Sequence, residues 1–164
     1  MEMTSTQRLI LANQYKLMGL LDPTHATQYE RLEMIVKGGF ELELKELDNA
    51  FLNMTEAECR SVLDTLEMYH ALQISYENLT EKTALSAHRL QFVGYDAIRE
   101  KKYLNYLRFL TNIEGKYQAF MQCEHGCDSQ TPMCEKYHRM LHLWKQCPHQ
   151  YHLSLVEIQN ILNA

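Results

Sequence analysis

The sequence predicts an all-α, multihelical compact domain. Only 6 Gly and 3 Pro occur among 164 residues, which favours long uninterrupted elements. Apolar residues recur at three- and four-residue steps along much of the chain, as they do on one face of a helix. Capping boxes that begin helices are expected at three places: Thr4 to Gln7, Thr55 to Glu58 and Ser154 to Glu157. The length fits one domain over 1–164, in which a half 1–80 packs against a half 81–164.

The first half should contain four helices. The first, 5–21, carries apolar residues nearly all round its surface, which is typical of a central core helix or, alternatively, of a subunit interface. The second begins at Asp22-Pro23 and ends before Gly38-Gly39, as helices commonly do. Helices 42–51 and 56–71 follow, and the alternating run 72–76 allows one short β segment.

The second half holds the strongest periodic pattern of the chain. Aromatic and aliphatic residues at helical spacing predict one long helix over 97–121. A short helix is expected before it, within 86–95, and a polar loop after it, over 122–130. Thr131-Pro132 then begins a helix that ends at Cys147-Pro148, and a short helix behind Ser154 closes the chain.

The net charge of −5 is unevenly distributed. Segment 1–39 is neutral, 40–80 carries −7 and 81–164 carries +2. No apolar stretch approaches the roughly 20 residues of a membrane span, and no secretory signal pattern is present. We therefore expect a cytoplasmic protein without membrane contact, in which the five cysteines are reduced thiols.

A Cys/His-rich segment, 123–152, is the first place where chemistry could reside. Its candidate metal ligands are Cys123, Cys127, Cys134 and His138. Zinc takes about four such ligands, but the spacing is not a standard one and no CxxC occurs. We expect no metal and no cofactor. Cys134 also lies near a predicted helix start, where a thiolate would be favoured, so a reactive thiol is the alternative.

Segment 42–76 has the element order of a winged helix-turn-helix: helix, turn, helix and the allowed β segment. DNA binding requires cations that contact phosphates. The second helix instead carries Glu56, Glu58, Asp64 and Glu67 against Arg60 alone. The sequence therefore argues against nucleic acid as a partner and favours a helical hairpin that packs on the protein, with a nucleic-acid-binding regulator as the alternative.

Sequence signatures of enzymes are missing: neither GxGxxG, a P-loop, GxSxG nor HExxH occurs. We predict no catalytic or cofactor-binding residue, and a metal- or thiol-dependent enzyme is the second alternative. The favoured function is that of a self-associating, non-enzymatic interaction protein. Its contacts as a homo-oligomer are expected through the 97–121 helix or through the first helix, at Leu9, Ile10, Tyr15 and Met18.

The whole chain also resembles the YfbU family of uncharacterised bacterial proteins. The resemblance depends on the following segments: Gln7 to Leu11, Asn13 to Tyr15, Glu67 to Leu72, Phe92 to Asp96, Gln130 to Met133, Glu135 to Tyr137, Arg139-Met140, Gln150 to Ser154 and Asn163-Ala164. It implies an all-α, self-associating protein and supplies no activity, substrate or functional residue. Cys127 and Cys134 stand where aromatic residues are expected in that family.

Overall fold

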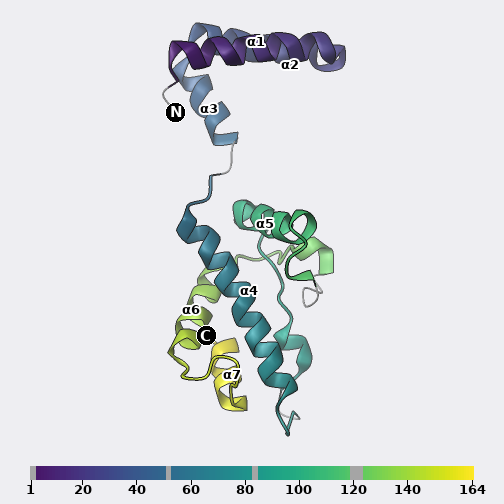
Figure 1. Cartoon of the computed structure of the whole chain (residues 1–164), viewed down its shortest axis with the longest axis vertical. Coiled ribbons are helices and arrows are strands. Elements are labelled where there is room, and N and C mark those ends of the chain that lie inside the picture. The colour runs from purple at the N-terminus through teal and green to yellow at the C-terminus, as the bar shows by residue number, and fades with distance from the viewer. Residues whose placement is uncertain (1–2, 51–52, 83–84, 119–123) are drawn as a thin grey trace. The chain divides into compact units, whose positions relative to one another are not determined.

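A computed structural model describes residues 3–50, 53–82, 85–118 and 124–164. The chain forms two compact units, Met1–Leu52 and Asn53–Ala164, and each is helical (Figure 1). The all-α prediction is confirmed. The described residues contain no strand, only an isolated β-bridge between Tyr95 and Asp128. The assignment of 1–164 to one domain with halves 1–80 and 81–164 stays a prediction.

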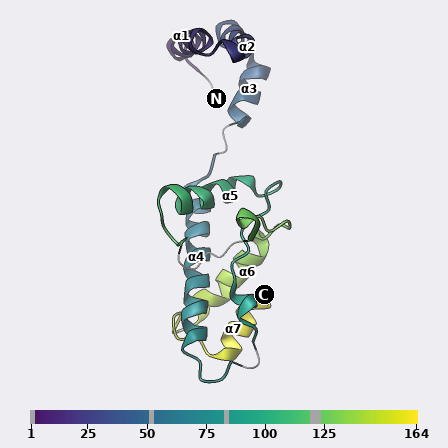
Figure 2. The same ribbon diagram turned by 90° about the vertical axis from the view of Figure 1, so that its right-hand side faces the viewer.

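The first unit is built around a helical hairpin. Helix α1 (Ser5–Leu21) begins at the expected capping box, in which the Thr4 hydroxyl accepts the Gln7 N–H. A 3₁₀ turn, Pro23–His25, leads into α2 (Ala26–Gly38), which ends where Gly39 adopts a φ of +64°. Helices α1 and α2 lie side by side (Figures 1 and 2). Helix α3 (Glu41–Ala50) follows α2.

Helix α1 is not the central core helix that was the favoured interpretation. Ala12 is its one buried residue, and the other buried apolar residues described in this unit are Ile35 and Val36 of α2. Within the unit, α1 packs mainly along α2. Its remaining apolar sides are left exposed, because the hairpin covers a helix on one side only.

The second unit surrounds α4 (Glu56–Glu77). Helices α5 (Lys101–Arg108), α6 (Cys134–Gln146) and α7 (Leu155–Leu162) all contact it (Figures 1 and 2). Their inward faces form one core with the loops between them. Its aromatic centre consists of mutually contacting rings: Tyr69, Phe92, Tyr95 and Tyr137.

The β segment allowed at 72–76 is helical, because α4 continues to Glu77. Leu72 and Ser75 are both buried, and they extend the inward face that Tyr69 occupies one turn earlier. The apparent alternation at 72–76 was thus the end of a helical repeat. The predicted winged helix-turn-helix over 42–76 therefore lacks the strand that it would need.

The long helix predicted over 97–121 is wrong in its extent. Helix α5 covers Lys101–Arg108 and continues as a π-helical turn, Phe109–Ile113. Gly115 and Tyr117 then have positive φ, +66° and +63°, which a right-handed helix cannot accommodate. Residues 119–121 lie outside the described part. The helix expected within 86–95 is reduced to a 3₁₀ turn, Ala87–Leu90, whereas the helix predicted over 131–147 is confirmed as α6.

Candidate interaction surface

Two sides of α1 are apolar, and only one of them meets α2. The small residues Ala12 and Gly19 lie on the side toward α2, where an added Cβ on Gly19 would stand 3.7 Å from the Tyr29 Cβ. Small residues let two helices approach closely. This side of α1 is therefore occupied by the hairpin partner.

The second apolar side is exposed. We call it the α1 stripe, and its members are 52% to 85% exposed: Leu9, Ile10, Leu17, Leu20 and Leu21. At roughly 100° per residue these five side chains span an arc of about 120°. That arc is centred well away from Ala12 and Gly19. Of the interface residues predicted from the sequence, Leu9 and Ile10 belong to the stripe.

Three of the stripe leucines were not singled out by the sequence analysis, although they lie on the helix that it named. The arc shared with Ile10 could have identified Leu17, Leu20 and Leu21. Tyr15 instead lies half-buried on the side nearer α2, and Met18, 42% exposed, lies just outside the stripe. The alternative surface on the 97–121 segment exposes Ile98, Phe109 and Ile113.

The Cys/His candidates that the structure describes, Cys127, Cys134 and His138, form no metal-binding group with one another. No group of three or more potential ligands is found among the described residues. Cys123 lies outside that part, and the expectation of reduced thiols is wrong for Cys127, which is disulfide-bonded. His138 is solvent-exposed and contacts the Ser61 hydroxyl through Nε2 at 3.3 Å. Cys134 is a free thiol, but it faces a carboxylate.

That carboxylate belongs to Glu100. Its Oε1 accepts the backbone N–H groups of Met133 and Cys134 at 2.8 and 2.7 Å. Burial raises the pKa of Glu100, but these hydrogen bonds outweigh it and the net pKa is lowered. Burial, followed by the hydrogen bond and charge of Glu100, raises the pKa of the Cys134 thiol to about 12. The idea of a Cys134 thiolate, based on the helix start, is therefore wrong, because burial and then the Glu100 carboxylate outweigh the positive end of α6.

The start of α4 uses its acidic residues in contacts within the protein. Glu58 closes the capping box with Thr55 and forms an ion pair with Lys102 of α5. Its hydrogen bond with Lys102 is the largest cause that lowers the pKa of Glu58 to about 2. Asp64 pairs with Lys145 of α6. Lys102 and Lys145 are thus paired with carboxylates of this helix, and Lys82 bonds the Glu77 carbonyl oxygen at its end. Nothing in the charge of the helix favours a nucleic-acid groove.

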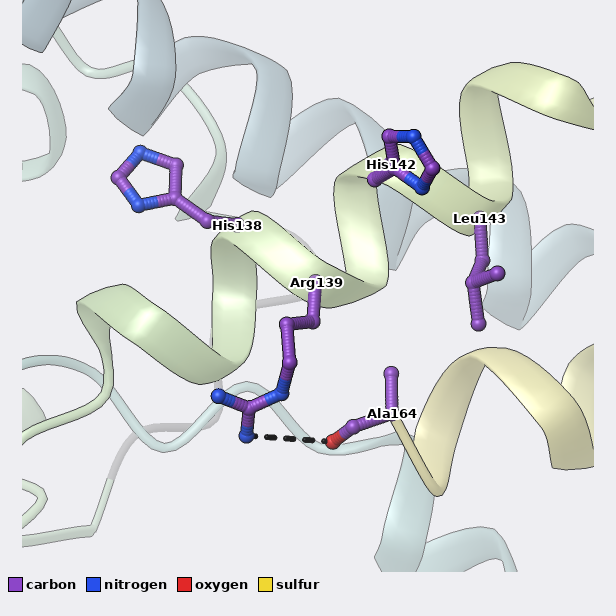
Figure 3. A pocket seen from close by; sticks show the side chains of 5 residues that line it. All are labelled: His138, Arg139, His142, Leu143 and Ala164. Carbon is purple, nitrogen blue, oxygen red and sulfur yellow. Dashed lines mark hydrogen bonds between the residues drawn. The ribbon is translucent and has the colours of Figure 1, made fainter.

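A shallow hollow of about 450 Å³ lies against α6. Its lining consists of His138, Arg139, His142, Leu143 and Ala164 (Figure 3). The Arg139 guanidinium donates to the Ala164 carbonyl oxygen at 3.5 Å. The Ser61–His138 contact pairs a hydroxyl with a base, but no described residue hydrogen-bonds the other ring nitrogen of His138. A general base is normally oriented by such a third group, which the described residues do not supply to His138.

No helix among the described residues is both long enough and apolar enough to cross a membrane. A family model described as the YfbU domain matches residues 1–164. The chain is 79% identical to a UPF0304 protein of Mannheimia succiniciproducens, and 73% identical to UPF0304 proteins of Histophilus somni and Pasteurella multocida. Each comparison covers the whole of both chains. The chain therefore belongs to the YfbU family.

Proposed function

We propose that this protein is a self-associating, non-enzymatic interaction protein, in which the α1 stripe docks on the α1 stripe of a second copy. The single observation that carries the proposal is the exposure of the stripe. Leu20 and Leu21 are 72% and 85% exposed at the end of a helix whose other apolar side is already packed. Exposed apolar patches mark protein–protein contacts, and the polar residues within this arc, Thr6 and Asn13, carry no charge.

The size of the stripe fits a pair of identical subunits. Its five side chains expose several hundred Å² together, which is a large part of the roughly 800 Å² that each partner contributes to a standard interface. A second copy presents the same surface, so a two-fold axis lets each stripe cover the other. Of the charged residues of α1, Arg8 lies far from the stripe, whereas Lys16 lies at its border, about 20° from Leu9. The long side chain of Lys16 can keep its ammonium group in water when two stripes pair.

The first unit also has little core of its own. Its described buried apolar residues are Ala12, Ile35 and Val36. Domains of this size are marginally stable even with a complete core, and oligomerisation is one of the usual remedies. Docking of two α1 stripes would convert each hairpin into half of a larger helical bundle. The cytoplasmic setting that we propose is supported by the free thiols of Cys59, Cys134 and Cys147, whereas the disulfide of Cys127 is unusual for that compartment.

Light scattering on the full chain at micromolar concentration tests the proposal. We expect a dimer for the native protein and for Val156→Asp, a matched control at an exposed apolar position of α7. The double variant Leu17→Asp/Leu20→Asp should be monomeric with unchanged helical circular dichroism. A native monomer would overturn the proposal, as would a dimer that survives both stripe substitutions. A monomer whose stripe is protected from hydrogen exchange would show that the chain's own second unit covers it.

A further inference from the structure

The outward side of α5 exposes apolar side chains. Ile98, in the turn before the helix, is 89% exposed, and Phe109 and Ile113, at the two ends of the π-helical turn that follows it, are 45% and 75% exposed. The opposite side of the helix is packed, since Leu104 and Leu107 are buried. π-Helical turns are rare and are frequently found at functional sites. We call the exposed surface from Ile98 to Ile113 the α5 face.

Three exposed cations belong to the α5 face. Arg99 and Lys101 form no ion pair with any described residue. Arg108 donates to an uncharged partner, the Gly126 carbonyl oxygen, at 3.2 Å. The face thus carries three positive charges without an ion-pair partner in the described part of the chain. A surface that is apolar and basic is complementary to one that is apolar and acidic.

Helix α3 has that complementary composition. Its four carboxylates and one lysine give it a net charge of −3. Glu41, Glu43 and Glu46 form no ion pair with the residues that the structure describes. Leu42 is 69% exposed, and Phe40, which directly precedes the helix, is 52% exposed. The first unit therefore leaves an acidic and apolar helix surface uncovered.

We propose that α3 of one copy docks on the α5 face of a second copy. This inference rests on the proposed self-association and adds a second contact to it. The α1 stripe supplies only part of the roughly 800 Å² that each partner contributes to a standard interface, and the α3–α5 contact supplies a further share. A two-fold axis repeats this contact in both directions, since each copy carries both surfaces. The opposite charges of the two surfaces select this pairing over α3 on α3 or α5 on α5.

Sedimentation of full-chain variants with reversed charges measures the contact. Arg99→Glu/Lys101→Glu should raise the dissociation constant of the dimer by about tenfold, because two like charges then face α3. Glu41→Lys/Glu46→Lys should raise it by a similar factor, since its lysines then face the cations of α5. All four positions are exposed, so both variants should fold, and their circular dichroism should match that of the native protein.

Mixing the two variants is the decisive step. In a mixed dimer each α3 meets an α5 face of opposite charge, so the mixture should associate nearly as tightly as the native protein does. The matched control is Arg31→Glu/Lys136→Glu, which changes the net charge as much as the α5 variant does. Its positions lie on α2 and α6, outside both surfaces, and its dissociation constant should stay close to the native one.

The outcomes separate this contact from the α1 stripe. A native dimer that neither charge reversal weakens would overturn the α3–α5 contact and leave the stripe proposal standing. A native monomer would overturn both proposals. Weakening that mixing does not reverse would also overturn the contact, because α3 would then not bind across two copies. If that weakening is reversed only when all four substitutions are combined in one chain, the occupant of the α5 face is α3 of the same chain.

Discussion

The Glu100 carboxylate accepts the backbone N–H of Cys134 at 2.7 Å from a position 34 residues earlier in the chain. The same carboxylate accepts the N–H of Met133 through Oε1 and that of Asp96 through Oε2. One buried side chain thus caps α6 and secures the turn before α5. Glu100 thereby joins the turn before α5 to the start of α6.

Replacement of Glu100 by Gln should destabilise the second unit. The amide offers one acceptor oxygen where the carboxylate offers two, so at least one buried N–H loses its partner. Such a loss costs roughly 1–3 kcal/mol. Urea unfolding at neutral pH, followed by circular dichroism, measures the difference. Glu114→Gln, at an exposed ion pair with Lys116, is the control and should change the stability by less than about 0.5 kcal/mol.

The Glu100 contribution should also depend on pH. The pKa of Glu100 is lowered in the folded protein, so its contribution is complete above the ordinary carboxyl pKa and declines as the pH falls below it. The pKa of Glu58, lowered to about 2 by Lys102 and Thr55, acts in the same direction. Acid unfolding should therefore be shallower in Glu100→Gln than in the native protein. Identical pH profiles would contradict the assignment.

Cys134 should react more slowly near neutral pH than Cys59 and Cys147, the other free cysteines of the described residues. Burial and Glu100 raise its pKa to about 12, and the thiolate is the reactive form. Iodoacetamide labelling followed by peptide mass spectrometry should show little modification of Cys134 at pH 8 and a rise above pH 10. In Glu100→Gln the rate should increase, because the negative charge beside the thiol is gone. Rapid labelling of native Cys134 at pH 7 would refute this interpretation.

The local part of this fold could be predicted from the sequence, and the long-range part could not. Thr4, Thr55 and Ser154 cap their helices as expected, because a capping box involves residues only three positions apart. The prediction for the Cys134 thiol was wrong because its pKa depends on burial and on Glu100, and both follow from tertiary packing. Likewise, Gly115 could be read as a local weakening of a helix, but not as its end at a positive φ.

The candidate interaction surface was predicted in part for the same reason. Helical spacing placed Leu9 and Ile10 on an apolar helix, but spacing alone could not tell which side α2 would cover. Only the structure of the α1–α2 hairpin shows that Tyr15 lies on the side nearer α2, away from the exposed stripe. Likewise, Gly39 lies close to the Arg8 guanidinium from 31 positions further along the chain, and no motif joins the two residues.

Gly94→Ala should destabilise the protein severely. Gly94 has a φ of +92°, and a Cβ there would lie 1.8 Å from the Cys127 carbonyl oxygen. That oxygen also accepts the Tyr95 N–H at 3.0 Å, so the bridge between the two loops would have to open. We expect a loss above about 3 kcal/mol. Gly115→Ala is the matched control: its φ is +66° but it faces open space, so about 1–2 kcal/mol is expected. Equal thermal shifts in the two variants would contradict the steric explanation.

Zinc should not stabilise the protein at equimolar concentration. Thiol ligands must be deprotonated to bind zinc, whereas Cys127 is disulfide-bonded and the pKa of Cys134 is about 12. We expect the same melting temperature with one equivalent of zinc and with EDTA, in scanning calorimetry of the full chain. More than about half an equivalent of zinc in the purified protein would instead require a site.

The stability of α1 should depend on protein concentration if its stripe is covered by a second copy. Association stabilises only the parts that it buries or orders, and by mass action this effect grows with concentration. Hydrogen exchange read by mass spectrometry can compare peptides from α1 with peptides from α6, whose residues Tyr137 and Met140 are buried within the second unit. Exchange in α1 should slow as the concentration rises from nanomolar to micromolar, while exchange in α6 stays constant. In Leu17→Asp/Leu20→Asp the α1 peptides should exchange fast at every concentration. Strong protection of native α1 that does not vary with concentration would mean that the stripe is covered within a single chain, and self-association would then have no surface on which to depend.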